Sequence, residues 1–253
     1  MLLLTRNLVA LVTLLVAGAP LVGCAGFRDK MEPVHTAFEA GDYAKADALL
    51  DELEQDDPSN RQVYALNQGV IKLARHMVKP ALEKFLFGRD RMDELATPDF
   101  GNYFGAMLTD DTALPYQGED YERILVRAML AVTDLMGDRQ DADAFALQVL
   151  DKQLEIMNAF EDPDGNKPKK EYKLVAFGSY LRGILNEENP MTLDVARREF
   201  GRVIELAPKF PGGMADLKRV TDGQFSAKGN GVVHVLAPVG RGPFKIESDE
   251  PIS

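Results

Sequence analysis

The stretch VARREFGRVIELAP (residues 195–208) holds a small residue, a large apolar residue and a proline at fixed offsets, namely Ala196, Phe200 and Pro208. A small residue lets a second helix approach closely, a large one fills the space beside it, and proline cannot continue a helix. The same residue types recur in the same order elsewhere in the chain, at Ala46, Leu50 and Pro58, at Ala81 and Phe85, and more weakly from Ala142. The spacing predicts an all-α fold with an internal repeat of helical hairpins.

The sequence around the first copy predicts how one hairpin is built. Gly41 and Asp42 interrupt the helical pattern, and residues 43–53 then place apolar side chains along one face of the next helix. Further apolar stripes cover residues 121–135, where the chain should turn at Gly137, and residues 142–160. These stripes predict consecutive helices joined by short turns.

The alanine, large apolar and proline positions resemble the tetratricopeptide repeat. In that repeat the alanine lies at the crossing of two helices, the large residue fills the gap and the proline ends the second helix. The resemblance implies an array of helical hairpins that presents a concave groove to peptides or proteins. The tryptophan of the repeat is missing, since the chain contains none, and Tyr64 and Tyr180 take its place. A helical bundle with the same packing rules is the alternative.

The helical period weakens between about residues 88 and 118, where prolines and glycines accumulate. We interpret this stretch as a loop inserted into a helical domain of residues 31–222. Long loops in compact domains are usually functional or disordered, and the apolar content of this one favours packing over disorder. Tyr103, Phe104 and Met107 are therefore candidate contacts for a partner.

The last segment, residues 223–253, changes from a helical to a strand-like period. GVVHVLAPV (residues 231–239) and GPFKIES (residues 242–248) are rich in β-branched and aromatic residues and meet at a glycine-rich turn. This pattern predicts a small C-terminal β-hairpin. The chain stops soon after the second strand, so we expect that this copy is truncated.

The N-terminus has the pattern of an export signal, which we assign to residues 1–23. A short start with one positive charge precedes an apolar stretch that is interrupted before it reaches the length of a membrane span. The single cysteine of the chain, Cys24, follows directly in PLVGCAGF (residues 20–27). A plain signal peptide or an uncleaved anchor with an incidental cysteine is the alternative.

Residues 20–27 resemble the lipobox of bacterial lipoproteins. The resemblance implies cleavage between Gly23 and Cys24, a diacylglycerol on the Cys24 sulfur, acylation of the new amine by a chain such as palmitate, and a lipidated tether of residues 24–30. Several acyl chains on one residue make membrane anchoring stable where one chain is marginal. Because Ala25 and not an aspartate follows, the resemblance favours the outer membrane, with the protein facing the periplasm.

A second resemblance covers most of the chain after Cys24. Three segments, LPYQGEDYERILVRAML (residues 114–130), FGSYLRGILNE (177–187) and GVVHVLAPVGRGPFKIE (231–247), are similar to a family of uncharacterised bacterial lipoproteins with tetratricopeptide-like repeats. The residues that carry the similarity are Tyr116, Gly118, Tyr121, Glu122, Tyr180 and Gly183. Ala128 and Met129 stand where that family often has a tyrosine. The resemblance implies a place in the envelope and no particular reaction.

Composition and motifs exclude several classes of function. Forty acidic against 29 basic residues give a formal charge of −11, which repels nucleic acid. The three histidines lack metal-ligand spacing, and no nucleophile elbow, zinc-protease or phosphate-loop motif occurs. We therefore expect no catalytic residue, no metal and no cofactor.

These observations together predict a non-catalytic adaptor or scaffold. A lipid would hold it at the membrane, and its helical repeats would bind other envelope proteins or peptides. Two alternatives stay open. One is a protein that binds or remodels peptidoglycan, and the other is a purely structural envelope lipoprotein.

Overall fold

The computed structural model describes residues 27–96, 115–159, 168–223 and 231–239. Every regular element in these ranges is an α-helix or a short 3₁₀ helix, which confirms the predicted all-α class for the described part of the chain. None of the helices in these ranges is long and apolar enough to cross a membrane. Residues 1–26, which include Gly23 and Cys24, and the loop residues Tyr103, Phe104 and Met107 lie outside them.

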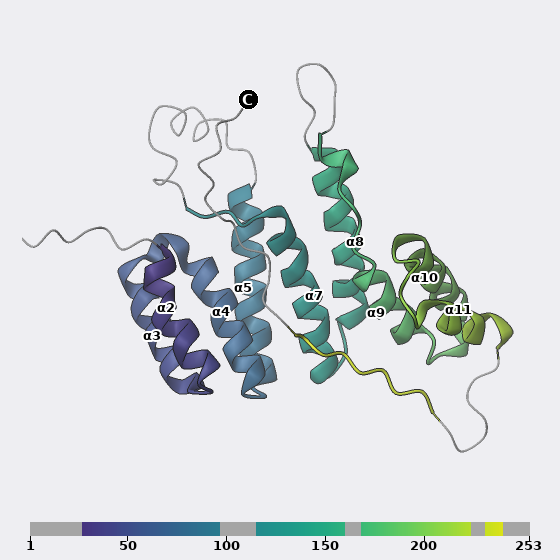
Figure 1. Ribbon diagram of the computed structural model, residues 1–253, viewed down its shortest axis with the longest axis horizontal. Coiled ribbons are helices and arrows are strands. Elements are labelled where there is room, and N and C mark those ends of the chain that lie inside the picture. The colour runs from purple at the N-terminus through teal and green to yellow at the C-terminus, as the bar shows by residue number, and fades with distance from the viewer. Residues whose placement is uncertain (1–26, 97–114, 160–167, 224–230, 240–253) are drawn as a thin grey trace, which may run out of the picture. The chain divides into compact units, whose positions relative to one another are not determined.

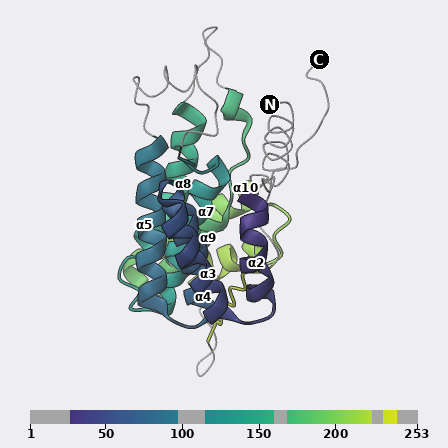
Figure 2. The same ribbon diagram turned by 90° about the vertical axis from the view of Figure 1, so that its left-hand side faces the viewer.

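The chain divides into two compact units, with the boundary along the chain between residues 169 and 170. Unit 1 contains six α-helices in its described residues, of which each packs against the next. Figure 1 shows this row, and Figure 2 shows it from the end where α2 and α3 lie. The helices are α2 (Phe27–Glu39), α3 (Tyr43–Asp56), α4 (Arg61–Ala74), α5 (Val78–Ala96), α7 (Asp120–Met136) and α8 (Ala142–Ala159), and a 3₁₀ turn, η1 (Pro58–Asn60), precedes α4.

Unit 2 contains three described α-helices, and α10 packs against both of the others. These helices are α9 (Phe177–Asn186), α10 (Leu193–Leu206) and α11 (Gly213–Asp222). A 3₁₀ turn, η4 (Pro190–Thr192), leads into α10, and another, η3 (Pro168–Glu171), spans the boundary between the units.

The turns between the helices lie where the sequence predicts them. Gly41 adopts the left-handed conformation with φ of +76° between α2 and α3, which glycine tolerates because it lacks a Cβ atom. The Asp42 carboxylate then accepts a hydrogen bond of 3.1 Å from the Lys45 backbone N–H and caps the start of α3. Pro58 and Pro208 are exposed and follow the ends of α3 and α10.

The predicted repeat residues form the contacts between helices. All seven are buried, with at most 2% of the residue surface exposed: Ala46, Leu50, Ala81, Phe85, Ala142, Ala196 and Phe200. A close contact that the sequence did not predict accompanies two of them. A Cβ atom built on Gly69 of α4 would lie 2.6 Å from the ring of Phe85, and one on Gly183 of α9 would lie 2.6 Å from the ring of Phe200. The same glycine–phenylalanine contact therefore joins two separate helix pairs.

Alanine at either glycine is expected to destabilise the protein. The added methyl group must displace a buried ring, so Gly69→Ala and Gly183→Ala should each cost about 1–3 kcal/mol. Gly201 of α10 is the control, because a Cβ atom there meets nothing within 4 Å. Gly201→Ala should instead stabilise by about 0.5–1 kcal/mol, since it removes glycine from a helix interior. Urea unfolding followed by circular dichroism measures all three, and equal shifts would contradict the close contacts.

Two predicted boundaries are wrong. The inserted loop was expected from about residue 88, but the helix continues to Ala96 as α5. Gly88 within this helix lets Leu66 of α4 approach closely, because a Cβ atom at residue 88 would lie 2.5 Å from Leu66 Cδ2. The predicted tether overlaps α2, which begins at Phe27 because Met31, Val34 and Ala37 bury one of its faces.

The predicted C-terminal β-hairpin is not supported. Residues 231–239 form neither strand nor helix, and residues 240–253 lie outside the described ranges. The strand-like alternation is visible in the burial, since Val233 and Val235 are exposed whereas His234 and Leu236 are half-buried. A strand also needs a neighbouring strand, and the described residues contain none for this segment.

Candidate functional site

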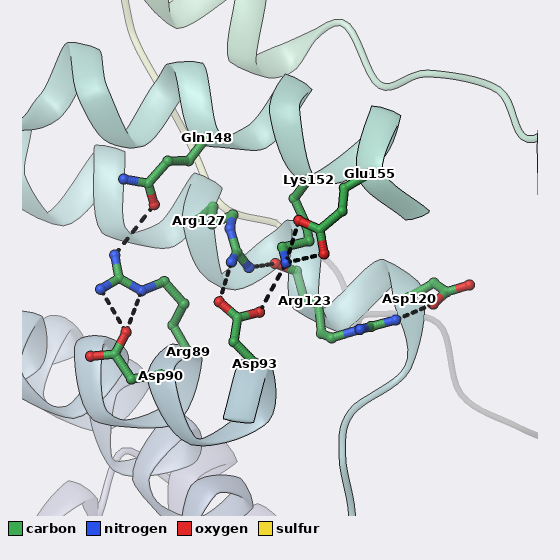
Figure 3. A network of polar contacts seen from close by, with 9 residues as sticks. All are labelled: Arg89, Asp90, Asp93, Asp120, Arg123, Arg127, Gln148, Lys152 and Glu155. Atoms are coloured by element: carbon green, nitrogen blue, oxygen red, sulfur yellow. Dashed lines mark hydrogen bonds and ion pairs between the residues drawn. The ribbon is translucent and has the colours of Figure 1, made fainter. Parts of the chain in front are cut away.

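Unit 1 has a polar cluster between α5, α7 and α8, with Asp93 of α5 at its centre (Figure 3). One carboxylate oxygen of Asp93 lies 2.5 Å from Nη2 of Arg127 on α7. The other lies 3.2 Å from Nζ of Lys152 on α8. The side chains of Arg127 and Lys152 are only 5% and 10% exposed, so this carboxylate neutralises two nearly buried cations.

Further bonds extend this cluster along the three helices (Figure 3). Arg89 of α5 donates to Asp90 at 2.8 Å and to Gln148 of α8 at 3.3 Å, and Lys152 lies 2.8 Å from Glu155. Burial lowers the pKa of Arg127, and the charge of Asp93 opposes this shift. Arginine stays protonated at any physiological pH. The cluster therefore joins three helices through fixed charges, an arrangement suited to stability more than to proton transfer.

A second cluster explains part of the family-like motif. The hydroxyl of Tyr116 donates to the Glu122 carboxylate at 2.5 Å, and the same carboxylate accepts the backbone N–H of Glu119 at 2.9 Å, as part of the capping box that begins α7. Gly118 turns the chain between them with φ of +81°. The backbone N–H of Tyr116 also donates to Asn60 at 2.9 Å, which fixes the entry of α7 against the start of α4.

The chemistry of this corner is structural. Burial raises the pKa of Tyr116, and the hydrogen bond to Glu122 raises it further, so the hydroxyl stays protonated and acts as a donor. Tyr121, the remaining residue of the motif, is half-buried in the first turn of α7. The structure thus brings Tyr116, Gly118 and Glu122 together where they determine how the helix begins.

Unit 2 contains the third cluster, which includes the predicted residue Tyr180. His234 Nδ1 lies 3.2 Å from the Tyr180 hydroxyl, and its Nε2 lies 2.8 Å from the Glu187 carboxylate. Glu187 also accepts two hydrogen bonds from Arg219 of α11, at 2.6 and 3.1 Å, and Arg219 donates to Asp216 at 2.7 Å. Through His234 these contacts attach residues 231–239 to α9 and α11.

Burial and charge shift two pKa values in this cluster. Burial raises the pKa of Tyr180, as does the negative charge of Asp216. Burial alone would lower the pKa of Arg219, but Glu187 and Asp216 raise it overall. The ring of Tyr180 also packs edge-on against Phe210, with ring centres 5.0 Å apart. A phenol with a raised pKa stays protonated near neutral pH, so Tyr180 keeps its hydroxyl proton.

Sequence reasoning placed Tyr180 and Gly183 in a motif but missed their partners. Gly183 contacts Phe200, and Tyr180 contacts a histidine 54 residues away, which no local spacing reveals. Among the described residues, no group of three or more His, Cys, Asp or Glu side chains is arranged to hold a metal ion. No protein-family model, curated protein or solved structure matches the chain.

Proposed function

We propose that this protein is a lipid-anchored envelope lipoprotein that binds other proteins through a tetratricopeptide-like array of helical hairpins and catalyses no reaction. The observation that carries the proposal is the repeated glycine–phenylalanine contact. Phe85 and Phe200 each follow a buried alanine by four residues, and the ring of each packs against a glycine of the preceding helix. Equal contacts at equal positions in two helix pairs support a repeating unit, and repeats of this kind commonly serve as binding surfaces.

The polar clusters support binding over catalysis. Asp93 and Glu187 each pair with cationic or imidazole groups on two different elements, and Glu122 binds Tyr116 and Glu119 where α7 begins, so these charges are committed to the positions of helices and segments. A general acid or base instead needs to face a substrate with a pKa near the working pH. Helices held in this way within each unit present their side chains in a set arrangement, which suits recognition.

The proposed binding face lies on the first helix of each pair in unit 1. In the proposed array of helical hairpins, the first helices would line one side, where arrays of this kind form their binding surface. Val70 of α4 and Leu125 of α7 are 40% and 46% exposed there, which is high for apolar residues in helix interiors. Tyr103, Phe104 and Met107 remain proposed partner contacts in addition to this face.

Aspartate at both Val70 and Leu125 is expected to reduce capture of envelope proteins at least several-fold, because charge at an apolar contact must be desolvated on binding. Leu154→Asp is the matched control, since Leu154 is 41% exposed but lies on α8, the second helix of its pair. Crosslinking in membranes followed by affinity purification measures capture, and circular dichroism verifies the fold. Equal capture by all variants would refute the binding face. Steady cleavage of peptidoglycan by the purified protein would refute the adaptor function itself.

The proposed location follows from the N-terminus. Acylation of Cys24 would place the helical units next to a membrane, and Ala25 favours the periplasmic side of the outer membrane in the lipobox pattern. An adaptor tethered there would meet exported proteins and not nucleic acid, in keeping with the formal charge of −11.

A further inference from the structure

Three arginine side chains converge on one buried carboxylate in unit 2. Glu199 of α10 has a side chain that is only 1% exposed. Arg182 of α9 donates to one of its oxygens at 2.9 Å, and Arg202 donates to the other at 2.9 Å. Arg198 lies 3.8 Å from the first oxygen. All three guanidinium groups are therefore within 4 Å of the same carboxylate.

Arg198 and Arg202 share Glu199 as a carboxylate partner. In the described part of the chain, no second carboxylate forms an ion pair with either of them. These two guanidinium groups therefore carry more positive charge than the carboxylate they share, on a protein with 40 acidic and 29 basic residues.

The excess charge faces solvent. The side chain of Arg198 is 58% exposed and that of Arg202 is 33% exposed, whereas Arg182 is only 14% exposed. Arg198 and Arg202 are four residues apart on α10, so they lie on the same face about 6 Å apart. A guanidinium group has five N–H donors, and Glu199 occupies only some of them. Both side chains therefore keep N–H donors that Glu199 does not use, on the same exposed face of α10.

We propose that Arg198 and Arg202 bind an acidic peptide segment of a partner protein. Glu199 and Arg182 act as positioning residues, because the buried carboxylate accepts hydrogen bonds from Arg182 and Arg202 and lies 3.8 Å from Arg198. This proposal rests on the adaptor function and adds the chemistry of one partner. Guanidinium groups bind carboxylates through paired hydrogen bonds, so two of them at helical spacing fit successive acidic side chains.

A peptide fits this site better than a membrane surface does. The formal charge of −11 repels an extended anionic surface, which would meet many acidic residues together with the two arginines. A single acidic segment contacts only the local patch. Screening by salt shortens the range of the repulsion to about 10 Å at 0.1 M, so a narrow ligand avoids most of it.

The test uses the full chain and two labelled hexapeptides, hexaglutamate and hexaglutamine, with fluorescence anisotropy at low and high salt. Arg198→Gln should weaken hexaglutamate binding about fivefold. Arg198→Lys should weaken it less, because lysine keeps the positive charge but lacks the paired N–H donors of the guanidinium group. Arg197→Gln is the matched control, since Arg197 is an exposed neighbour on α10 that takes no part in the Glu199 cluster. It should leave the binding unchanged.

Three outcomes would overturn the proposal. The first is binding of hexaglutamine as tight as that of hexaglutamate, and the second is equal weakening by the Arg197 and Arg198 variants, which would indicate diffuse attraction. The third is Arg198-dependent binding of phosphatidylglycerol vesicles without binding of hexaglutamate, which would assign the site to a membrane. Capture of envelope proteins through Val70 and Leu125 is measured in a separate experiment. A negative result with hexaglutamate would therefore refute the acidic-peptide site and not the adaptor function. A negative result in the capture experiment would refute the binding face and leave the hexaglutamate result unaffected.

Discussion

A chain that carries Cys24→Ser is expected to incorporate no palmitate and to keep its first 23 residues. The proposed lipoprotein processing requires a sulfur nucleophile at that position, and the chain has no other cysteine that could replace it. A serine hydroxyl is a far weaker nucleophile than a thiolate. Labelling of cells with radioactive palmitate, together with the mass of the purified product, measures both effects.

The variant should also lose its hold on the membrane once residues 1–23 are removed. If a different protease cleaves off these residues, the product should leave the membrane fraction. Each buried acyl methylene contributes about 0.8 kcal/mol to anchoring, so loss of the chains removes most of the membrane affinity. The circular dichroism of the helical units should not change, because the described helices begin at Phe27. Label that still enters the serine variant would disprove the lipid assignment.

Asp93→Asn is expected to lower the free energy of unfolding by about 1–3 kcal/mol, since it leaves the nearly buried Arg127 without its carboxylate, whereas Lys152 keeps Glu155. The partners are Arg127 and Lys152, which are 5% and 10% exposed. Asparagine keeps the size of the side chain, so the loss reports charge and not packing. Urea unfolding with far-ultraviolet circular dichroism gives the value.

The neighbouring residue Asp90 provides the control. It also pairs with an arginine, Arg89, but its side chain is 65% exposed. Exposed ion pairs contribute about 0–1 kcal/mol, so Asp90→Asn should have little effect. If the two asparagine variants unfold at the same urea concentration, the Asp93 cluster does not stabilise the three helices.

Local patterns in the sequence predicted the helices well. The stripe of residues 121–135 became α7 and that of residues 142–160 became α8, because apolar spacing reflects the face that each helix buries, although Leu125 and Leu154 of these stripes are exposed. The repeat alanines are buried for the same reason. The end of α5 was predicted too early, because the helical period weakens after residue 88, whereas the helix continues to Ala96 and its Gly88 lets Leu66 of α4 approach closely.

The candidate sites depend on contacts between distant residues, which single-sequence patterns do not encode. Asp93 and Arg127 are 34 residues apart, and either alone is indistinguishable from a solvated surface charge. The resemblance did identify Tyr116 and Glu122, but only the structure shows that they form the entry of α7. The strand prediction for residues 231–239 failed because alternation describes one segment, whereas a strand requires two.

The attachment of residues 231–239 through His234 has a consequence for hydrogen exchange. Within the described ranges, no backbone hydrogen bond joins this segment to a helix, and its contacts with Tyr180 and Glu187 come from the imidazole ring. Protection of an amide from deuterium exchange reports its hydrogen bond and not its position. We therefore expect these amides to exchange faster than those inside α9, although His234 contacts the same unit.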